Sequence, residues 1–182
     1  KRIAYILLFS LLLVSCGTRS GYFKMEGRFL HMNQGELYVY SPDGGIAGLD
    51  TIKIEAGRFS YEKPCSKPST LIIIFPNYST QPIFAESGEA VEVKADASHL
   101  KEMEVEGTED NELMTKFRKQ IASVSPPEEL KYAIAFINDH PESAVSAYLL
   151  NRYLVQTESP DYKQAAKLLP LLIKEQPDNA SL

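Results

Sequence analysis

The first half of the chain contains short runs in which apolar and polar residues alternate, separated by glycine, proline and polar turn residues. Strict alternation places every second side chain on one face of a β-strand. Phe23 and Met25 share one face of such a run, and Leu37 and Val39 share a face of the next. Together the runs predict about seven strands in an antiparallel β-sandwich or open barrel. They lie at 22–29, 35–41, 50–62 (two strands meeting at Ala56 and Gly57), 70–76, 82–87, 89–96 and 103–107.

The pattern changes to a helical period after Gly107. Nine of the ten glycines lie between Gly21 and Gly107 and none follows, and glycine is unfavourable inside helices. Apolar residues then recur at helical spacing, so the fold is predicted to be mainly β with α, with a C-terminal bundle of about four helices. Ser125 and Pro126 predict a helix start, whereas Pro170 is expected to kink or break the last helix. The helical segments are 108–121, 125–141, 142–155 and 159–169.

The N-terminus carries a short apolar run at residues 3–14, directly after Lys1 and Arg2. A helix of this length spans roughly 18 Å, whereas the core of a bilayer, about 30 Å thick, needs roughly twenty residues. Residues 3–14 are therefore too few to form a transmembrane helix. A charged start, a short apolar middle and an exit through a small residue are typical of a secretory signal peptide, which is predicted at residues 1–15.

Leu13, Val14, Ser15 and Cys16 resemble the lipobox of bacterial lipoproteins. The resemblance implies cleavage before Cys16, attachment of diacylglycerol to its thiol, and a lipid anchor in a membrane; the alternative is an ordinary secretory signal that ends near a cysteine. The expected organisation is a lipidated linker at 16–21, a β-sandwich domain at 22–107 and a helical arm at 108–182. The expected location is the cell envelope, at the outer membrane facing the periplasm, because Gly17 replaces the acidic residue associated with inner-membrane retention.

Charge and cysteine content narrow the possible partners. Removing Lys1 and Arg2 from the 19 basic residues leaves 17 against 24 acidic ones, a net charge of about −7. An acidic body argues against nucleic acid and anionic lipid as partners. Only Cys65 remains after lipidation, so no intramolecular disulfide forms, and no Cys-x-x-Cys pair is present.

No sequence pattern indicates catalysis, a metal site or a cofactor. The three histidines, His31, His99 and His140, are far apart in the sequence and form no metal-ligand motif. Cys65 is a possible reactive thiol, because Lys63 and Lys67 nearby would favour a thiolate. An inert thiol in a loop or at a strand edge is the preferred interpretation, and we do not expect an enzyme.

Tyr38 and Tyr40 form a possible binding face for a protein partner or a glycan. Alternation places both on the face opposite Leu37 and Val39. If Leu37 and Val39 face the core, the tyrosines are exposed. The reverse orientation fits the pattern equally well, so the sequence does not decide between them.

Several segments carry a family resemblance that spans nearly the whole mature chain: "FKMEG" at 23–27, "VEGTEDN" at 105–111 and "FINDHPESAVSAYLL" at 136–150. With the lipobox, they resemble the N-terminal domain of unknown function, with its helical arm, in envelope lipoproteins of the thiol-disulfide oxidoreductase type. In that family the domain precedes a thioredoxin-like domain with a Cys-x-x-Cys site, which this sequence lacks. No catalytic residue is carried over.

These observations favour a lipid-anchored, non-catalytic envelope module that binds or positions a protein partner within a thioredoxin-like system. One alternative is the N-terminal part of an oxidoreductase whose Cys-x-x-Cys domain lies beyond Leu182. Another is a tetratricopeptide-like adaptor, because Pro141 and Pro177 stand 36 residues apart in similar segments and that repeat has a period of about 34.

Overall fold

The computed structural model describes residues 18–182. The predicted signal peptide at 1–15, the lipobox residues Leu13, Val14 and Ser15, and the lipidated Cys16 lie outside the described residues. Within residues 18–182, no helix is long and apolar enough to cross a membrane.

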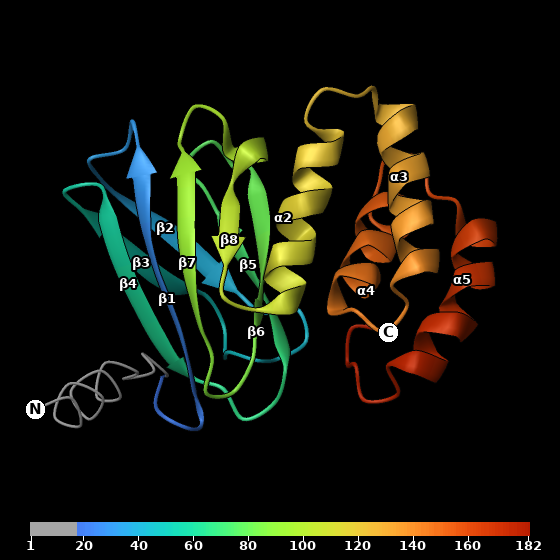
Figure 1. Cartoon of the computed structure of the whole chain (residues 1–182), viewed down its shortest axis with the longest axis horizontal. Helices are drawn as coiled ribbons and strands as arrows, with labels where there is room; N and C mark the ends of the chain where they lie inside the picture. Colours follow the sequence, from blue (N-terminus) through green and yellow to red (C-terminus); the bar gives the residue numbers. More distant parts are fainter. Residues whose placement is uncertain (1–17) are drawn as a thin grey trace, which may run out of the picture.

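Eight strands form one sheet in the order β6-β5-β2-β3-β4-β1-β7-β8, which curves into a nearly closed barrel (Figure 1). The strands are β1 (Tyr22–Leu30), β2 (Gln34–Tyr40), β3 (Asp50–Glu55), β4 (Arg58–Pro64), β5 (Ser69–Ile74), β6 (Thr80–Ala85), β7 (Ala90–Asp96) and β8 (Glu104–Glu106). The predicted β-barrel or sandwich followed by helices is confirmed. Neighbouring strands are antiparallel except β1 and β7, which are parallel. Alternation predicts which face a strand buries, but not the direction of its neighbour.

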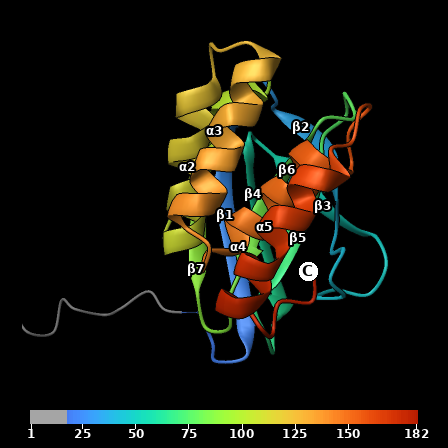
Figure 2. The same ribbon diagram turned by 90° about the vertical axis from the view of Figure 1, so that its right-hand side faces the viewer.

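The alternating apolar residues fill the barrel interior. Phe23, Met25, Leu37 and Val39 are each at most 1% exposed. By contrast, β5 buries residues on both of its faces, as its continuous apolar run predicts. The second face of β5 is covered because the helical arm lies beside it (Figure 2).

Helices occupy the rest of the chain, with a 3-10 turn, η1 (Leu100–Glu102), before β8. As predicted, a helix begins at Pro126 after Ser125, whose backbone N–H and hydroxyl donate to the Glu128 carboxylate at 3.1 and 2.7 Å. The elements are α2 (Glu109–Ile121), α3 (Pro126–Asp139), α4 (Ala144–Leu150), a π-helical turn η2 (Asn151–Val155) and α5 (Tyr162–Glu175).

Of the kink or break expected at Pro170, the break does not occur: α5 continues from Tyr162 to Glu175. Proline removes the hydrogen bond to the carbonyl four residues earlier, which here belongs to Ala166. Ala166 and Pro170 are both exposed, so water can bind the freed carbonyl. Leu168 and Leu172 are buried before and after the proline, and their packing stabilises the continuous helix.

Helix α2 lies across the gap between the two edge strands of the sheet, β6 and β8 (Figure 1). Edge strands expose backbone groups that lack a neighbouring strand. Asn111 accepts a hydrogen bond from the Phe84 N–H at 3.0 Å and donates to the Phe84 carbonyl at 2.7 Å. One turn later, the Thr115 hydroxyl accepts from the Val105 N–H at 2.8 Å and lies 2.9 Å from the Val105 carbonyl. The helix therefore takes the place of a strand at both edges.

Arg118 continues this row of polar side chains on α2. Its guanidinium donates to the carbonyls of Pro82 at 3.1 Å and Met103 at 3.3 Å, one on each side of the gap. It also donates to the Gln81 side chain at 2.9 Å. Burial lowers the pKa of Arg118 to about 10, so the group stays charged at neutral pH and fixes the helical arm against the sheet.

Candidate functional site

A groove separates one side of the sheet from the helical arm. It consists of two adjoining cavities, of about 520 and 440 Å³, which share Thr70 and Ala180 in their walls. Ligand pockets commonly lie where two structural units meet. We call the smaller one the tyrosine cavity and the larger one the acidic cavity, after the side chains described below.

Both halves of the chain line the tyrosine cavity. The π-helical turn η2 brings polar side chains into its wall, and such turns are rare and often found at functional sites. The lining residues are Tyr40, Thr70, Ile72 and Thr80 from the sheet, Pro42 from the loop after β2, Tyr148, Asn151, Arg152 and Gln156 from the helical arm, and Ala180 and Ser181 from the C-terminal segment.

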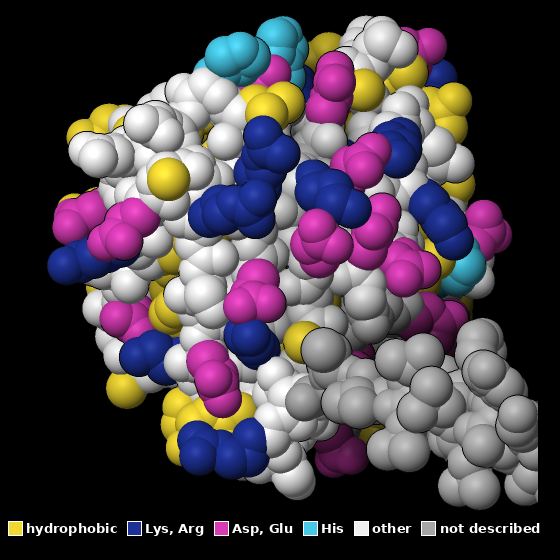
Figure 3. All heavy atoms as spheres, turned by 60° about the vertical axis from the view of Figure 1, so that its left-hand side comes forward, with side chains coloured by type: hydrophobic (Ala, Val, Ile, Leu, Met, Phe, Trp, Pro, Cys, Tyr) yellow, Lys and Arg dark blue, Asp and Glu magenta, His cyan; other side chains and the backbone are white. Residues whose placement is uncertain are grey.

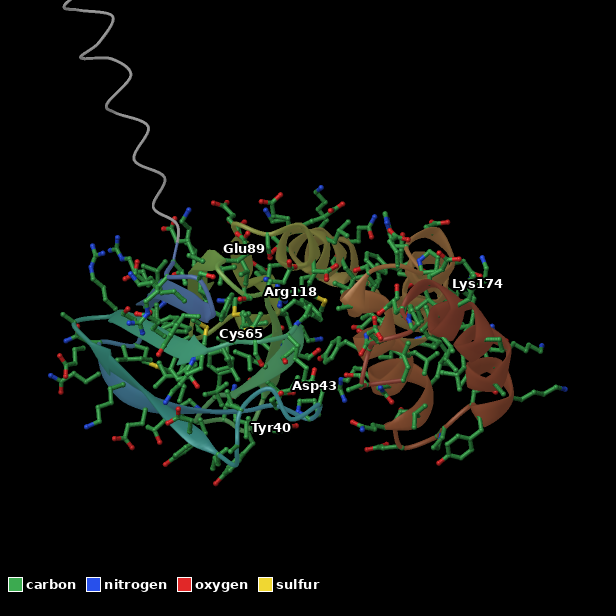
Figure 4. The ribbon with its side chains drawn as sticks, turned by 90° about the horizontal axis from the view of Figure 1, so that it is seen from below. Tyr40, Asp43, Cys65, Glu89, Arg118 and Lys174 are labelled. Carbon is green, nitrogen blue, oxygen red and sulfur yellow. The ribbon has the colours of Figure 1, made fainter. Side chains whose placement is uncertain are left out.

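The structure decides the orientation that the sequence left open for Tyr38 and Tyr40. Leu37 and Val39 face the core, so Tyr38 and Tyr40 are 43% and 36% exposed. Tyr40 lies at the side of the sheet that faces the helical arm (Figure 4), and it lines the tyrosine cavity, whereas Tyr38 does not.

Tyr148 lines the tyrosine cavity together with Tyr40 and Arg152. Burial raises the pKa of Tyr148, while Arg152 and Arg118 act in the opposite direction and Tyr40 adds to the rise. These effects require the two tyrosines and Arg152 to lie within electrostatic reach of one another. The Arg152 guanidinium makes no hydrogen bond or ion pair with another residue of the described chain.

The charges on the outer face of the barrel are arranged differently. There, lysine and arginine side chains lie among carboxylates (Figure 3). Lys94, for example, pairs with Glu106 at 3.3 Å, and Lys119 pairs with Glu104 at 2.6 Å. Arg152 differs from these lysines in having no such partner among the described residues, and it lines a cavity.

The acidic cavity has a strongly negative lining. Lys67 is the only lysine or arginine among its described lining residues. The carboxylates are Asp43, Glu86, Asp110, Glu142, Glu175 and Asp178.

Two of these carboxylates have raised pKa values. Burial is the main cause for Glu86, and the charges of Asp110, Glu89 and Glu109 add to it. Burial also raises the pKa of Asp110, although hydrogen bonds from the Ser143 hydroxyl at 2.5 Å and the Ala144 N–H at 3.4 Å oppose the shift. Negative charge in the cavity is therefore poorly compensated.

Another carboxylate of the acidic cavity, Asp43, stabilises the fold. Asp43 accepts a hydrogen bond from the Thr70 N–H at 2.6 Å and others from Ser41 and Gly45. It thus fixes the loop after β2 to β5. No group of three or more histidine, cysteine or acidic residues within residues 18–182 is arranged to hold a metal ion.

Cys65 lies inside the sheet (Figure 4) and does not line either cavity of the groove, although its neighbours Lys67, Glu86 and Asp43 line the acidic cavity. It is 6% exposed, and its thiol donates to the Lys67 carbonyl at 3.2 Å. Burial raises the pKa of the thiol, and Glu86 and Asp43 raise it further. Lys63 instead pairs with Asp50 at 2.6 Å, so the environment opposes thiolate formation.

Folding brings two histidines together that the sequence keeps apart. His31 lies 2.9 Å from one oxygen of Asp96, and His99 lies 3.7 Å from the other. Two histidine side chains are visible side by side at one end of the barrel in Figure 3. This cluster is remote from the groove.

Comparison with known proteins identifies the barrel. The family described as "Domain of unknown function (DUF4369)" matches residues 23–114 of the 182-residue chain. The chain belongs to this family. The DUF4369 match extends from β1 through β8 and into α2, as far as Met114. Searches of curated proteins and of solved structures found no match.

The groove therefore combines the DUF4369 region with helices beyond it. Tyr40, Thr70 and Thr80 lie inside the matched residues, whereas Tyr148 and Arg152 lie outside them. Sequence reasoning identified Tyr40 but missed Tyr148 and Arg152. The one signal for them was that residues 142–155 are apolar around much of the helix, which indicates neighbours on several sides.

Proposed function

We propose that this DUF4369 protein is a non-catalytic, lipid-anchored module of the cell envelope that holds a protein partner in the groove. The observation that carries the proposal is the tyrosine cavity, whose walls come from both halves of the chain and include Arg152, which forms no ion pair or hydrogen bond with another described residue. Aromatic residues and arginine are enriched at the energetic centres of protein interfaces.

The chemistry of the described side chains supports binding rather than catalysis. The Cys65 thiol is buried and its pKa is raised, although reactive cysteines usually have lowered pKa values. Asp43 and Asp110 accept hydrogen bonds that hold a loop and the start of α4. The purified protein should therefore not reduce insulin disulfides unaided, and reduction would contradict a non-catalytic role.

The proposed anchor comes from the sequence. Cys16 lies six residues before Tyr22, where β1 begins. An extended segment of that length spans at most about 20 Å, so a lipid on Cys16 would keep the barrel close to the outer membrane, on its periplasmic side. Cys16→Ala should leave an uncleaved precursor without acyl label, and normal maturation of this variant would refute the anchor.

The partner is proposed to belong to a thioredoxin-like system, as the family resemblance implies. A photo-crosslinking residue at position 40, introduced in the native host, should capture one defined envelope protein. The control places the same residue at Glu62, an exposed position on β4 away from the groove. Equal capture from both positions, or none from position 40, would contradict the binding role of the groove.

A further inference from the structure

The tyrosine cavity offers a receptor for a carboxylate. Arg152 projects from the π-helical turn η2 beside Tyr148 and Tyr40. Its guanidinium has five N–H donors in a fork that fits a carboxylate, and none is used by another described side chain. The two phenol rings supply apolar walls with polar tips, which suits a ligand that has both kinds of surface.

The acidic cavity determines the charge that the rest of that ligand carries. Six carboxylates and one lysine line it, and it meets the tyrosine cavity at Thr70 and Ala180. A polyanion on Arg152 would be repelled by these carboxylates at close range. A ligand with an anionic end and a cationic part satisfies both cavities, and their volumes fall in the range of about 300–1,000 Å³ that ligand sites occupy.

We infer that the groove binds a basic peptide with a free C-terminal carboxylate. The carboxylate lies on Arg152 between Tyr40 and Tyr148, and lysine or arginine side chains lie in the acidic cavity. The inference rests on the proposed function and names the chemical class that the groove binds. Recognition of a terminal carboxylate is a recurring mode of peptide binding.

Titration of the ¹⁵N-labelled protein with synthetic peptides, followed by NMR, tests this inference. Lys-Lys-Gly with a free carboxylate should shift the amide signals of Thr70, Arg152 and Ala180 in a saturable manner. Its C-terminal amide should bind about tenfold more weakly, because it lacks the charged hydrogen bonds to Arg152. Glu-Glu-Gly should not bind, because its side chains meet the acidic cavity.

Variants separate recognition of the carboxylate from general attraction. Arg152→Gln should weaken binding of the free-carboxylate peptide about tenfold and leave binding of the amide unchanged. Arg58→Gln removes the same charge from an exposed site on β4 and should change neither. Equal binding of the acid and the amide to the unmodified protein, or equal weakening of both by Arg152→Gln, would overturn the inference.

Two further comparisons complete the test. Free lysine should bind at least about tenfold more weakly than Lys-Lys-Gly, because it cannot span both cavities. Equal binding of the two would show that the groove binds single amino acids, and would overturn the inference that it binds a peptide. Position-40 crosslinking without peptide binding would leave the binding role intact and refute only the ligand chemistry. Peptide binding without crosslinking would leave the ligand chemistry intact and refute the proposed protein partner.

Discussion

Gly27 occupies a position in β1 where a side chain would point into the barrel between those of Met25 and Phe29. A Cβ atom there would lie 2.5 Å from Cε1 of Phe59 and 2.6 Å from the Val93 carbonyl oxygen. The Phe59 ring cannot move away freely, because it stacks on Phe29 with a centroid distance of 5.5 Å. The carbonyl belongs to β7, which pairs with β1 along its length. Gly27→Ala therefore forces strand or ring displacement.

The size of the effect follows from two opposing contributions. Overpacking a core costs about 1–3 kcal/mol, whereas replacing glycine by alanine gains about 0.4–1 kcal/mol through the unfolded state. The free energy of unfolding should fall by about 1–2 kcal/mol. For a chain of this size, that corresponds to a decrease in Tm of roughly 2–8 °C. Urea denaturation followed by circular dichroism measures both the free energy and the slope m.

Gly35→Ala is the matched control. Gly35 also lies in a strand, β2, and the atom nearest to a Cβ placed there is the Met32 sulfur at 3.7 Å. This variant should be as stable as the unmodified protein or more stable by up to about 1 kcal/mol. If Gly27→Ala proves as stable as Gly35→Ala, the close packing of β1 against Phe59 and β7 is wrong.

Three other changes test separate parts of the structure. Asn111→Ala leaves the Phe84 N–H and carbonyl without partners, so urea denaturation should show a loss of about 2–4 kcal/mol, whereas the exposed Asn138→Ala should change stability by less than about 0.5 kcal/mol. The hydrogen bond from Lys63, followed by that from the Thr51 N–H, lowers the pKa of Asp50. The contribution of Asp50 to stability is therefore present above the unfolded pKa of about 3.9 and is lost as pH falls through the lower folded value. Denaturation midpoints of Asp50→Asn should therefore fall less steeply below about pH 4; an unchanged acid profile would refute the role of this ion pair. Cys65 should react slowly with Ellman's reagent in the native protein and quickly in urea, and equal rates would contradict its burial.

Local signals in the sequence predicted most of the secondary structure. Alternation located the strands because successive side chains of a strand point to opposite faces, and Ser125 with Pro126 located a helix start because they satisfy its free N–H groups. The parallel pairing of β1 and β7 and the continuity of α5 through Pro170 were not predicted. Both depend on what lies beside the segment, since neighbouring strands set the first and burial of Leu168 and Leu172 stabilises the second.

The sequence by itself determined the order of the barrel and the helices, the resemblance of residues 13–16 to a lipobox, and the pairing of Tyr38 and Tyr40 on one face. These properties depend on residues close together in the chain. Only the tertiary structure decided that this face is exposed and that Tyr40 meets Tyr148 and Arg152. It also gathered carboxylates from distant segments into one cavity and set α2 across the open edges of the sheet. Such meetings arise because burial and hydrogen bonding bring together segments that the sequence separates by many residues.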